Sequence, residues 1–226
     1  MLKVILWDVG GPLLDEDDFY VLWERGVRTT AAETLGREIS DAEFEQAKEW
    51  AIQSYAPYTF RAMLYELVGR DEPLHGIALK KFYAAVPWHS DTLQPGIKDL
   101  LRDLSPRVPM TIVANQLKGV AARLDELGIA QYFKHIVSAG EFGLSKPDLR
   151  IYQHALGKLG VTPEEALMVG DRQDNDVVPA KMLGIKTLLL RQGWYKNQKV
   201  RVPEEQADWT VKSVPEMITK LRDLFP

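Results

Sequence analysis

Four short polar signals are spread along the chain of 226 residues, and their residue types could form one reactive site. They are Asp8 after the apolar run 4–7, Asn115 after 111–113, Lys146 before Pro147, and the pair Asp171 and Asp176 after 166–169. Ligands of open parallel α/β sheets bind outside the carboxyl ends of the strands. If the apolar runs are strands, three carboxylates, an amide and an ammonium meet in one crevice. Carboxylates can bind a divalent cation and an ammonium can bind an anion, so the set is a candidate reactive site.

The apolar runs predict the sheet that must position these residues. Short apolar runs are typical of strands buried on both faces. Residues 4–7 form a wholly apolar run, and similar runs occur at residues 110–113, 135–137, 166–169 and 186–190. Helical stripes alternate with the runs from about residue 93 onward. This order predicts an α/β fold: a Rossmann-like parallel sheet with helices on both faces. Residues 192–205 are expected to form a surface loop, and residues 214–224 a closing helix.

Residues 15–90 interrupt the alternation of strands and helices. They show helical patterns at residues 19–35, 41–56, 59–68 and 77–85, without a convincing strand. Ser40 and Glu43 are spaced as a capping box at the start of one of these helices. We therefore expect a helical domain at 15–90, inserted into a core made of 1–14 and 91–226. Placed directly after the first strand, it is expected to act as a lid on the site.

Composition narrows the class of protein. The net charge of −4 argues against a nucleic-acid partner or an anionic membrane held by bulk electrostatics. The chain has no cysteine, which excludes disulfides, thiolate metal sites and cysteine nucleophiles. No segment approaches the roughly 18–20 apolar residues that a membrane span needs. The first residues resemble a strand rather than a signal peptide. We expect a cytoplasmic protein that is a monomer or a homodimer.

In their order and spacing, the four signals resemble the motifs of the haloacid dehalogenase superfamily, over essentially the whole chain. The matching segments are Asp8-Val9-Gly10-Gly11-Pro12-Leu13, Ile112-Val113-Ala114-Asn115, Lys146-Pro147, and Gly170-Asp171 with Asp176. Any one motif is weak, but all four in this order are a specific signal. The helical insertion after the first strand resembles the small α-helical cap of that family.

The resemblance implies a Mg²⁺-dependent phosphatase that acts on a small phosphorylated substrate. Its nucleophile would be Asp8, which forms an aspartyl-phosphate that water then hydrolyses. Lys146 would be the second catalytic residue, placing its charge beside the phosphate and the nucleophile. The implied metal ligands are Asp8, the backbone carbonyl of Gly10, Asp171 and, in a supporting role, Asp176. The implied phosphate-binding residues are Val9, Gly10, Ala114, Asn115 and Lys146.

The sequence departs from the family pattern at three positions. Gly10 stands where the family usually has a second aspartate, a general acid–base whose contribution is typically about 10²–10⁴ in rate. Ala114 replaces a hydroxyl that commonly binds phosphate, and Pro12 removes one backbone donor. Because the nucleophile and the metal ligands remain, these changes indicate a slow or specialised phosphatase. A substrate with a good leaving group, such as an acyl or anomeric sugar phosphate, would depend less on the missing acid.

Two other functions fit parts of the pattern. The three departures also suit a member that has lost catalysis and binds an anion or a protein partner. A 2-haloacid dehalogenase also uses an aspartate nucleophile, but that branch needs no metal and usually has tyrosine at the position of Gly10. The intact pair Asp171 and Asp176 therefore favours metal and phosphate. Arg172, directly after the metal aspartate, could reach a phosphate or point into solvent. The sequence does not identify the substrate.

Overall fold

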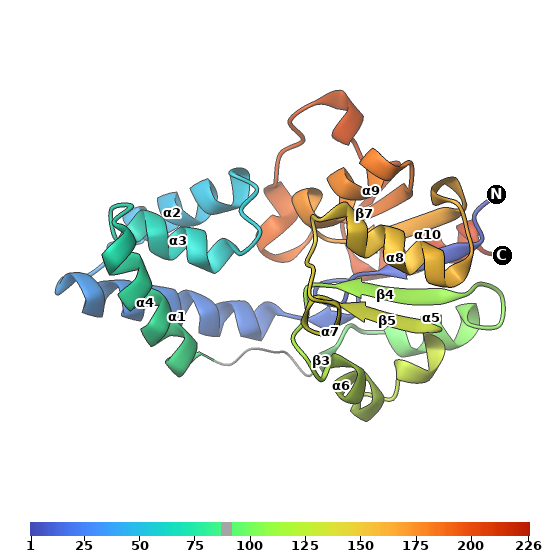
Figure 1. The fold of residues 1–226 in the computed structure, drawn as a ribbon, viewed down its shortest axis with the longest axis horizontal. Helices are drawn as coiled ribbons and strands as arrows, with labels where there is room; N and C mark the ends of the chain where they lie inside the picture. Colours follow the sequence, from blue (N-terminus) through green and yellow to red (C-terminus); the bar gives the residue numbers. More distant parts are fainter. Residues whose placement is uncertain (87–91) are drawn as a thin grey trace. The chain divides into compact units, whose positions relative to one another are not determined.

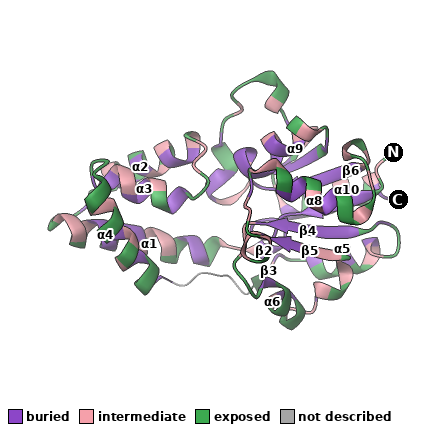
Figure 2. Ribbon diagram, viewed as in Figure 1, coloured by how far each residue is buried: buried purple, intermediate pink, exposed green. Residues whose placement is uncertain are grey.

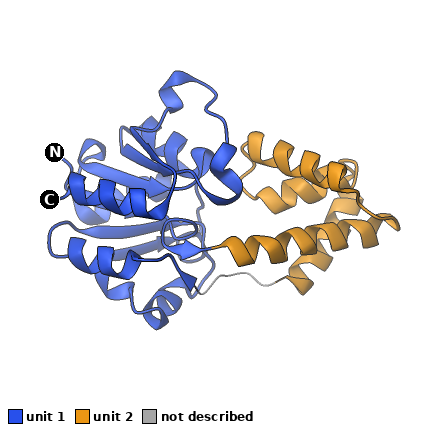
Figure 3. Cartoon of the chain, turned by 180° about the vertical axis from the view of Figure 1, so that it is seen from behind, with its two compact units in different colours: residues 1–15, 91–226 blue, residues 16–90 orange. Residues whose placement is uncertain are grey.

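The computed structural model describes residues 1–86 and 92–226, and the chain divides into two compact units (Figure 3). Unit 1 contains Met1–Asp15 and Asp91–Pro226, and unit 2 contains Glu16–Ser90. The first strand of the chain therefore belongs to the same unit as the whole second half of the sequence. The predicted boundary between residues 90 and 91 lies outside the described residues.

Unit 1 is built on a six-stranded sheet in the order β5-β4-β1-β6-β7-β8, in which all neighbours are parallel (Figure 1). The strands are β1 (Val4–Trp7), β4 (Met110–Ala114), β5 (His135–Ser138), β6 (Ala166–Gly170), β7 (Lys186–Leu190) and β8 (Trp209–Val211). The chain adds β4 and β5 on one side of β1, and β6 to β8 on the other side. This topology confirms the predicted Rossmann-like α/β fold. The edge strand β8 was not predicted.

Side chains of β1 alternate between two apolar clusters. Ile5 and Trp7 lie in one, with buried residues of α5 (Ile97–Leu104), α6 (Val120–Glu126) and α10 (Val214–Leu224). Val4 and Leu6 lie in the other, with residues of α8 (Leu149–Leu159) and α9 (Val178–Leu183). Helices thus cover both faces of the sheet, and the strands β1, β4 and β6 are fully buried between them (Figure 2). This arrangement explains why β1 is apolar at every position.

Short elements complete unit 1. Strands β2 (Leu14–Asp15) and β3 (Thr92–Leu93) pair antiparallel at the two points where the described chain leaves and re-enters this unit. Helix α7 (Ala139–Phe142) follows β5, and 3₁₀ turns cover Ala130–Tyr132, Pro163–Glu165, Gly193–Asn197 and Pro203–Glu205. The prediction of a surface loop at 192–205 was wrong in part, because Trp194, Tyr195 and Gln198 are buried. Their aromatic and amide groups pack and form hydrogen bonds within unit 1.

Unit 2 consists of the helices α1 (Asp17–Leu35), α2 (Asp41–Gln53), α3 (Thr59–Leu67) and α4 (Glu72–Ala85). Helix α2 begins with the expected capping box, in which the Ser40 hydroxyl and the Glu43 carboxylate each accept a backbone N–H. Aromatic packing joins the helices: the rings of Phe60 and Phe82 stack at 4.9 Å, and Trp23 meets Phe60 edge-on. None of the helices in the described part of the chain is long and apolar enough to cross a membrane.

Candidate active site

Three adjacent strands place the predicted site residues at one edge of the sheet. Asp8 directly follows β1, Asn115 follows β4, and Asp171 follows β6. These three strands are neighbours, with β1 in the middle, and the chain changes direction across the sheet at β1. Ligands of open α/β sheets bind at such a switch point, outside the carboxyl ends of the strands. The fold therefore brings these three residues, which are far apart in the sequence, to the edge of the sheet where a ligand would bind.

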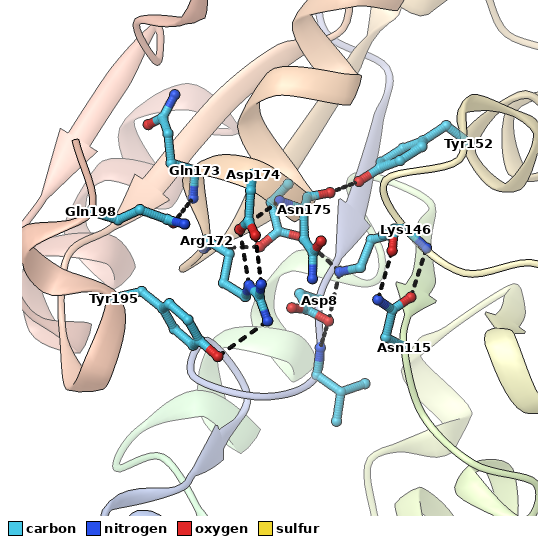
Figure 4. A network of polar contacts seen from close by, with 12 residues as sticks. Asp8, Asn115, Lys146, Tyr152, Arg172, Gln173, Asp174, Asn175, Tyr195 and Gln198 are labelled. Atoms are coloured by element: carbon cyan, nitrogen blue, oxygen red, sulfur yellow. Dashed lines mark hydrogen bonds and ion pairs between the residues drawn. The ribbon is translucent and has the colours of Figure 1, made fainter. Parts of the chain in front are cut away.

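A buried ion cluster forms at this edge (Figure 4). The ammonium of Lys146 lies 2.9 Å from Asp8 Oδ1 and 2.6 Å from Asp176 Oδ1. Carboxylate oxygens of Asp8, Asp171 and Asp176 all lie within 4.8 Å of one another. Lys146 and Asp176 are each 1% exposed, and Asp8 is 9% exposed. The structure thus brings together four residues that the sequence suggested for catalysis and metal binding.

Charges in this cluster shift one another's pKa. Burial by itself lowers the pKa of Lys146, but Asp176 and Asp8 more than offset that effect and raise it above the usual value. Burial raises the pKa of Asp176 to about 6; Lys146 and the Arg172 N–H oppose this rise, while the Asp8 charge adds to it. Lys146 is therefore a stable cation, and it compensates two carboxylates that have little access to water.

A π-helix at Gln173–Val177 presents Asp176 to the cluster. Its geometry is held from several sides: Asp176 Oδ2 accepts the backbone N–H of Arg172 at 3.0 Å, and the Tyr152 hydroxyl donates to the Asn175 carbonyl. The five residues of the π-helix are all buried. Asp174 and Asp176 are therefore not part of a solvated helix start, because both are buried. Single π-turns occur often at functional sites, where they redirect side chains.

Arg172 does not point into solvent. Its guanidinium makes two hydrogen bonds to Asp174, at 3.0 and 2.6 Å, and a third to the Tyr195 hydroxyl at 3.1 Å. It also stacks over the Tyr195 ring, 4.4 Å from the ring centre. Arg172 thus links the π-helix to the segment after β7. Gln198 adds a second link, because its side chain accepts the Gln173 N–H at 2.8 Å. Nothing in the sequence indicated Tyr195 or Gln198.

The loop after Asp8 is a tight turn. Asp8 Oδ1 accepts the N–H of Val9 at 2.8 Å, and the N–H groups of Leu13 and Leu14 both donate to the Val9 carbonyl. Gly10 lies in this turn and is buried. Gly11 has a left-handed backbone, with φ of 80°, and a Cβ at Gly11 would lie 2.8 Å from Asp171 Cγ. Glycine is therefore needed at position 11 for both its conformation and its size.

Two glutamines hold this turn from distant parts of unit 1. The Gly11 carbonyl accepts the side-chain N–H of Gln94 at 2.9 Å and that of Gln192 at 3.3 Å. Gln94 lies just after β3, and Gln192 lies just after β7. Sequence reasoning missed both residues. Neither has a recognisable local motif, and only the folded topology brings them to the turn after Asp8.

The two predicted phosphate-binding residues at the end of β4, Ala114 and Asn115, have different surroundings. Ala114 is fully buried, and its side chain is part of the apolar cluster that contains Trp7. The Asn115 side chain makes two hydrogen bonds to the backbone of Lys146, at 2.9 and 2.7 Å. The predicted phosphate-binding residues thus include one apolar core residue and one residue whose side chain holds the lysine loop.

Comparison with known proteins decides the family. A model of the haloacid dehalogenase-like hydrolases matches residues 2–184, which include all four polar motifs. The chain belongs to this family.

Relatives of this hydrolase include named phosphatases. It is 26% identical over 236 residues to the glyceraldehyde 3-phosphate phosphatase of Methanopyrus kandleri, and the match covers 99% of each chain. It is 29% identical over 183 residues to the phosphoserine phosphatase of Thermus thermophilus, covering 80% of this chain and 72% of that protein. A predicted phosphoglycolate phosphatase from Haemophilus somnus has the same fold, with a TM-score of 0.72, 17% identity and coverage of 97% and 98%.

The carboxylate cluster of this hydrolase fits the Mg²⁺ that the family generally uses. Mg²⁺ prefers oxygen ligands and is bound through a few carboxylates while it keeps several waters. Asp8, Asp171 and Asp176 offer three carboxylates close enough to share one ion. No cysteine competes as a softer ligand, since the chain has none.

Gly170 leaves room for the second acidic residue of the hydrolase. A Cβ at position 170 would lie 2.2 Å from Asp176 Cγ, so a methyl group cannot fit without moving that carboxylate. We expect Gly170→Ala to displace Asp176 and to destabilise the fold by about 1–3 kcal/mol, as overpacking does. Calorimetric titration with Mg²⁺ should then show at least a tenfold (~1.4 kcal/mol) weaker metal binding. Gly157→Ala, in α8, is a control for a glycine that has neither near neighbours nor a left-handed backbone. Unchanged metal affinity in Gly170→Ala would argue against Asp176 as part of the metal site.

Proposed function

We propose that this hydrolase is a Mg²⁺-dependent phosphatase of a small phosphorylated metabolite, with Asp8 as the nucleophile. The observation that carries the proposal is the position of Asp8, whose carboxylate lies beside the Lys146 ammonium and within reach of two further carboxylates. A carboxylate that approaches a phosphate dianion is repelled by it, so such a nucleophile needs cations around it. Lys146 provides one of these cations.

Asp8, Asp171, the Gly10 carbonyl and Asp176 would hold the magnesium ion. Bound there, the ion would neutralise charge on the phosphate and orient it for attack. Asp176 also holds the Lys146 ammonium at 2.6 Å, so it connects the metal ligands to the catalytic cation. The backbone N–H groups around Val9 and Gly10 and at the end of β4 would face the phosphate oxygens.

The reaction proceeds in two displacements at phosphorus. An Asp8 carboxylate oxygen forms a bond to phosphorus while the bond to the leaving oxygen breaks. Water then attacks the phosphorus of the aspartyl-phosphate, which releases inorganic phosphate and restores Asp8. The leaving oxygen must gain a proton, and in most of the family an aspartate at the position of Gly10 supplies it. Here the proton comes from the substrate, from water or from unit 2, or the leaving group is good enough to need none.

The named relatives suggest the substrate class. One acts on glyceraldehyde 3-phosphate and another on phosphoserine, and both of these are three-carbon monophosphates. We therefore infer a small phosphorylated metabolite as substrate. Unit 2, which is inserted directly after β1, is proposed as the cap that selects it. Closure of such a cap would exclude water from the reacting phosphate.

Phosphate release from a panel of substrates tests the proposal. The panel contains an acyl phosphate, an aryl phosphate, glucose 1-phosphate, glyceraldehyde 3-phosphate and phosphoserine, each with Mg²⁺ and with a chelator. We expect turnover that requires Mg²⁺ and is fastest with the acyl or aryl phosphate. Three departures from the family pattern also fit a member that only binds its ligand. They are Gly10 in place of an acid, Ala114 in place of a hydroxyl residue, and Pro12. Mg²⁺ binding without turnover on any substrate would favour that second function.

The missing acid gives a directional prediction. We expect Gly10→Asp to raise kcat on phosphoserine by up to about 10²-fold, because the new carboxyl can protonate a poor leaving group. The rate on the acyl phosphate should change much less, since its leaving group needs no proton. Gly10→Asn is the matched control, because it adds a side chain of the same size that is not an acid. If Gly10→Asp and Gly10→Asn behave alike, the missing acid is not what limits the rate.

A further inference from the structure

The segment that carries Lys146 has no regular secondary structure. It lies between α7, which ends at Phe142, and α8, which begins at Leu149. Backbone hydrogen bonds of a helix or strand therefore do not fix the position of the Lys146 Cα. A lysine side chain has four rotatable carbons and a strongly hydrated head, so it is one of the most costly side chains to hold in a single geometry. Something else must aim this ammonium at its two partners.

Asn115 makes a reciprocal pair of hydrogen bonds with the Lys146 backbone. Asn115 Oδ1 accepts the N–H of Lys146 at 2.7 Å, and Asn115 Nδ2 donates to the Lys146 carbonyl at 2.9 Å. Within the described residues, no other hydrogen bond reaches the backbone N–H or carbonyl of Lys146. An amide that binds both groups of one residue fixes that residue's position and its rotation, as a strand neighbour does.

Both ends of this connection are anchored. Asn115 directly follows β4, a fully buried strand next to β1. At the other end, the Lys146 ammonium lies 2.9 Å from Asp8, which directly follows β1. The rigid sheet thus sets the lysine relative to the nucleophile through one side-chain amide (Figure 4).

We propose that Asn115 is a positioning residue, which acts on the reaction by holding Lys146 against Asp8 and Asp176 and not by binding the phosphate with its side chain. The effect on the rate rests on the proposed phosphatase function; the effect on Lys146 itself does not. A displacement of about 1 Å at a catalytic group can lower a rate by roughly 10²-fold. Loss of the Asn115 amide should therefore lower the rate of phosphate release, because Lys146 would no longer be held in one position.

The first experiment follows Lys146 without any substrate. Asn115→Leu keeps the size of the side chain and removes both hydrogen bonds, and Gln116→Leu is the control at the next position. Competitive acetylation with mass spectrometry measures the reactivity of each lysine. We expect the labelling rate of Lys146 to rise at least about tenfold in Asn115→Leu alone, which corresponds to ~1.4 kcal/mol of lost protection. Lys181, with a side chain that is 27% exposed and paired to Asp208, should stay unchanged as the reporter of folding in unit 1.

Two results would overturn the proposal at this stage. Unchanged labelling of Lys146 in Asn115→Leu would mean that the amide does not hold the lysine. Equal increases at Lys146 and Lys181 would mean that the substitution loosens unit 1 as a whole. Asn115→Ala repeats the measurement with a smaller side chain, in case the leucine does not fit. This labelling experiment gives an answer even if the protein shows no phosphatase activity.

A double-mutant cycle then tests whether Asn115 affects catalysis through Lys146. The four proteins are the wild type, Asn115→Leu, Lys146→Met and the double variant, and kcat/KM is measured on the best substrate of the panel. If Asn115 acts through Lys146, its replacement lowers kcat/KM by about 10–10²-fold in the wild type and by less than about twofold in Lys146→Met. Equal losses in both backgrounds would show that Asn115 binds the substrate directly, and the proposal would fall.

Discussion

Replacement of Asp8 by asparagine is expected to lower phosphate release by at least about 10⁴-fold, with the fold intact. Asparagine has the same shape as aspartate but is a far weaker nucleophile, so no aspartyl-phosphate can form. The protein should remain folded because Lys146 keeps its ion pair with Asp176 at 2.6 Å. Turnover of the best substrate, measured beside thermal unfolding and trapping of the labelled phosphoenzyme, checks both statements.

Asp125→Asn is the matched control for this experiment. Asp125 is an exposed residue of α6, so the same chemical change there should leave the rate within about twofold of the wild type. Turnover of Asp8→Asn within tenfold of the wild type would exclude Asp8 as the nucleophile.

Replacement of Lys146 by methionine is expected to destabilise the protein by about 3–5 kcal/mol, besides its effect on catalysis. Methionine fills a similar volume, but it leaves the Asp8 and Asp176 carboxylates close together without their common cation. Because each kcal/mol corresponds to about 2–4 °C for a chain of this size, the melting temperature should fall by roughly 6–20 °C. Denaturant and thermal unfolding of the metal-free protein measure the loss.

Addition of Mg²⁺ shows whether Lys146→Met is less stable because it lacks a charge or because it packs less well. A cation bound by the same carboxylates should replace part of the missing charge, so the deficit in Lys146→Met should shrink as Mg²⁺ is added. Lys158→Met, at an exposed position of α8, is the control for loss of a lysine. A deficit in Lys146→Met that Mg²⁺ leaves unchanged would indicate that packing, not charge, explains the loss.

The sheet was predictable because its strands are buried on both faces. Apolar runs at β1, β4, β5, β6 and β7 differ clearly in composition from the amphipathic helices between them. The edge strand β8 escaped notice, because Trp209–Val211 is short and its burial is incomplete. The helices of unit 2 were also predictable from their apolar stripes and from the capping box at Ser40.

The site was predictable only as far as it follows the ends of strands. Position after a buried strand indicated Asp8, Asn115 and Asp171, and the family resemblance supplied roles for them. The partners of those residues were not predictable, because Gln94, Gln192 and Tyr195 act through side-chain contacts across unit 1. The role of the Asn115 side chain was equally hidden, because it depends on where an irregular loop passes.

The position of β1 at the centre of the sheet has a consequence for synthesis of the chain. β1 leaves the ribosome before unit 2 and before the other strands of the sheet, yet Ile5 pairs with Met110 and Val4 pairs with Ala166. The four apolar residues of β1 therefore stay unpaired while unit 2 is translated, because their partner strands β4 and β6 come later in the chain. Contacts this distant in sequence slow folding and leave apolar segments open to aggregation. Production of the protein should thus depend on chaperones that shield short apolar segments, more than production of unit 2 alone would.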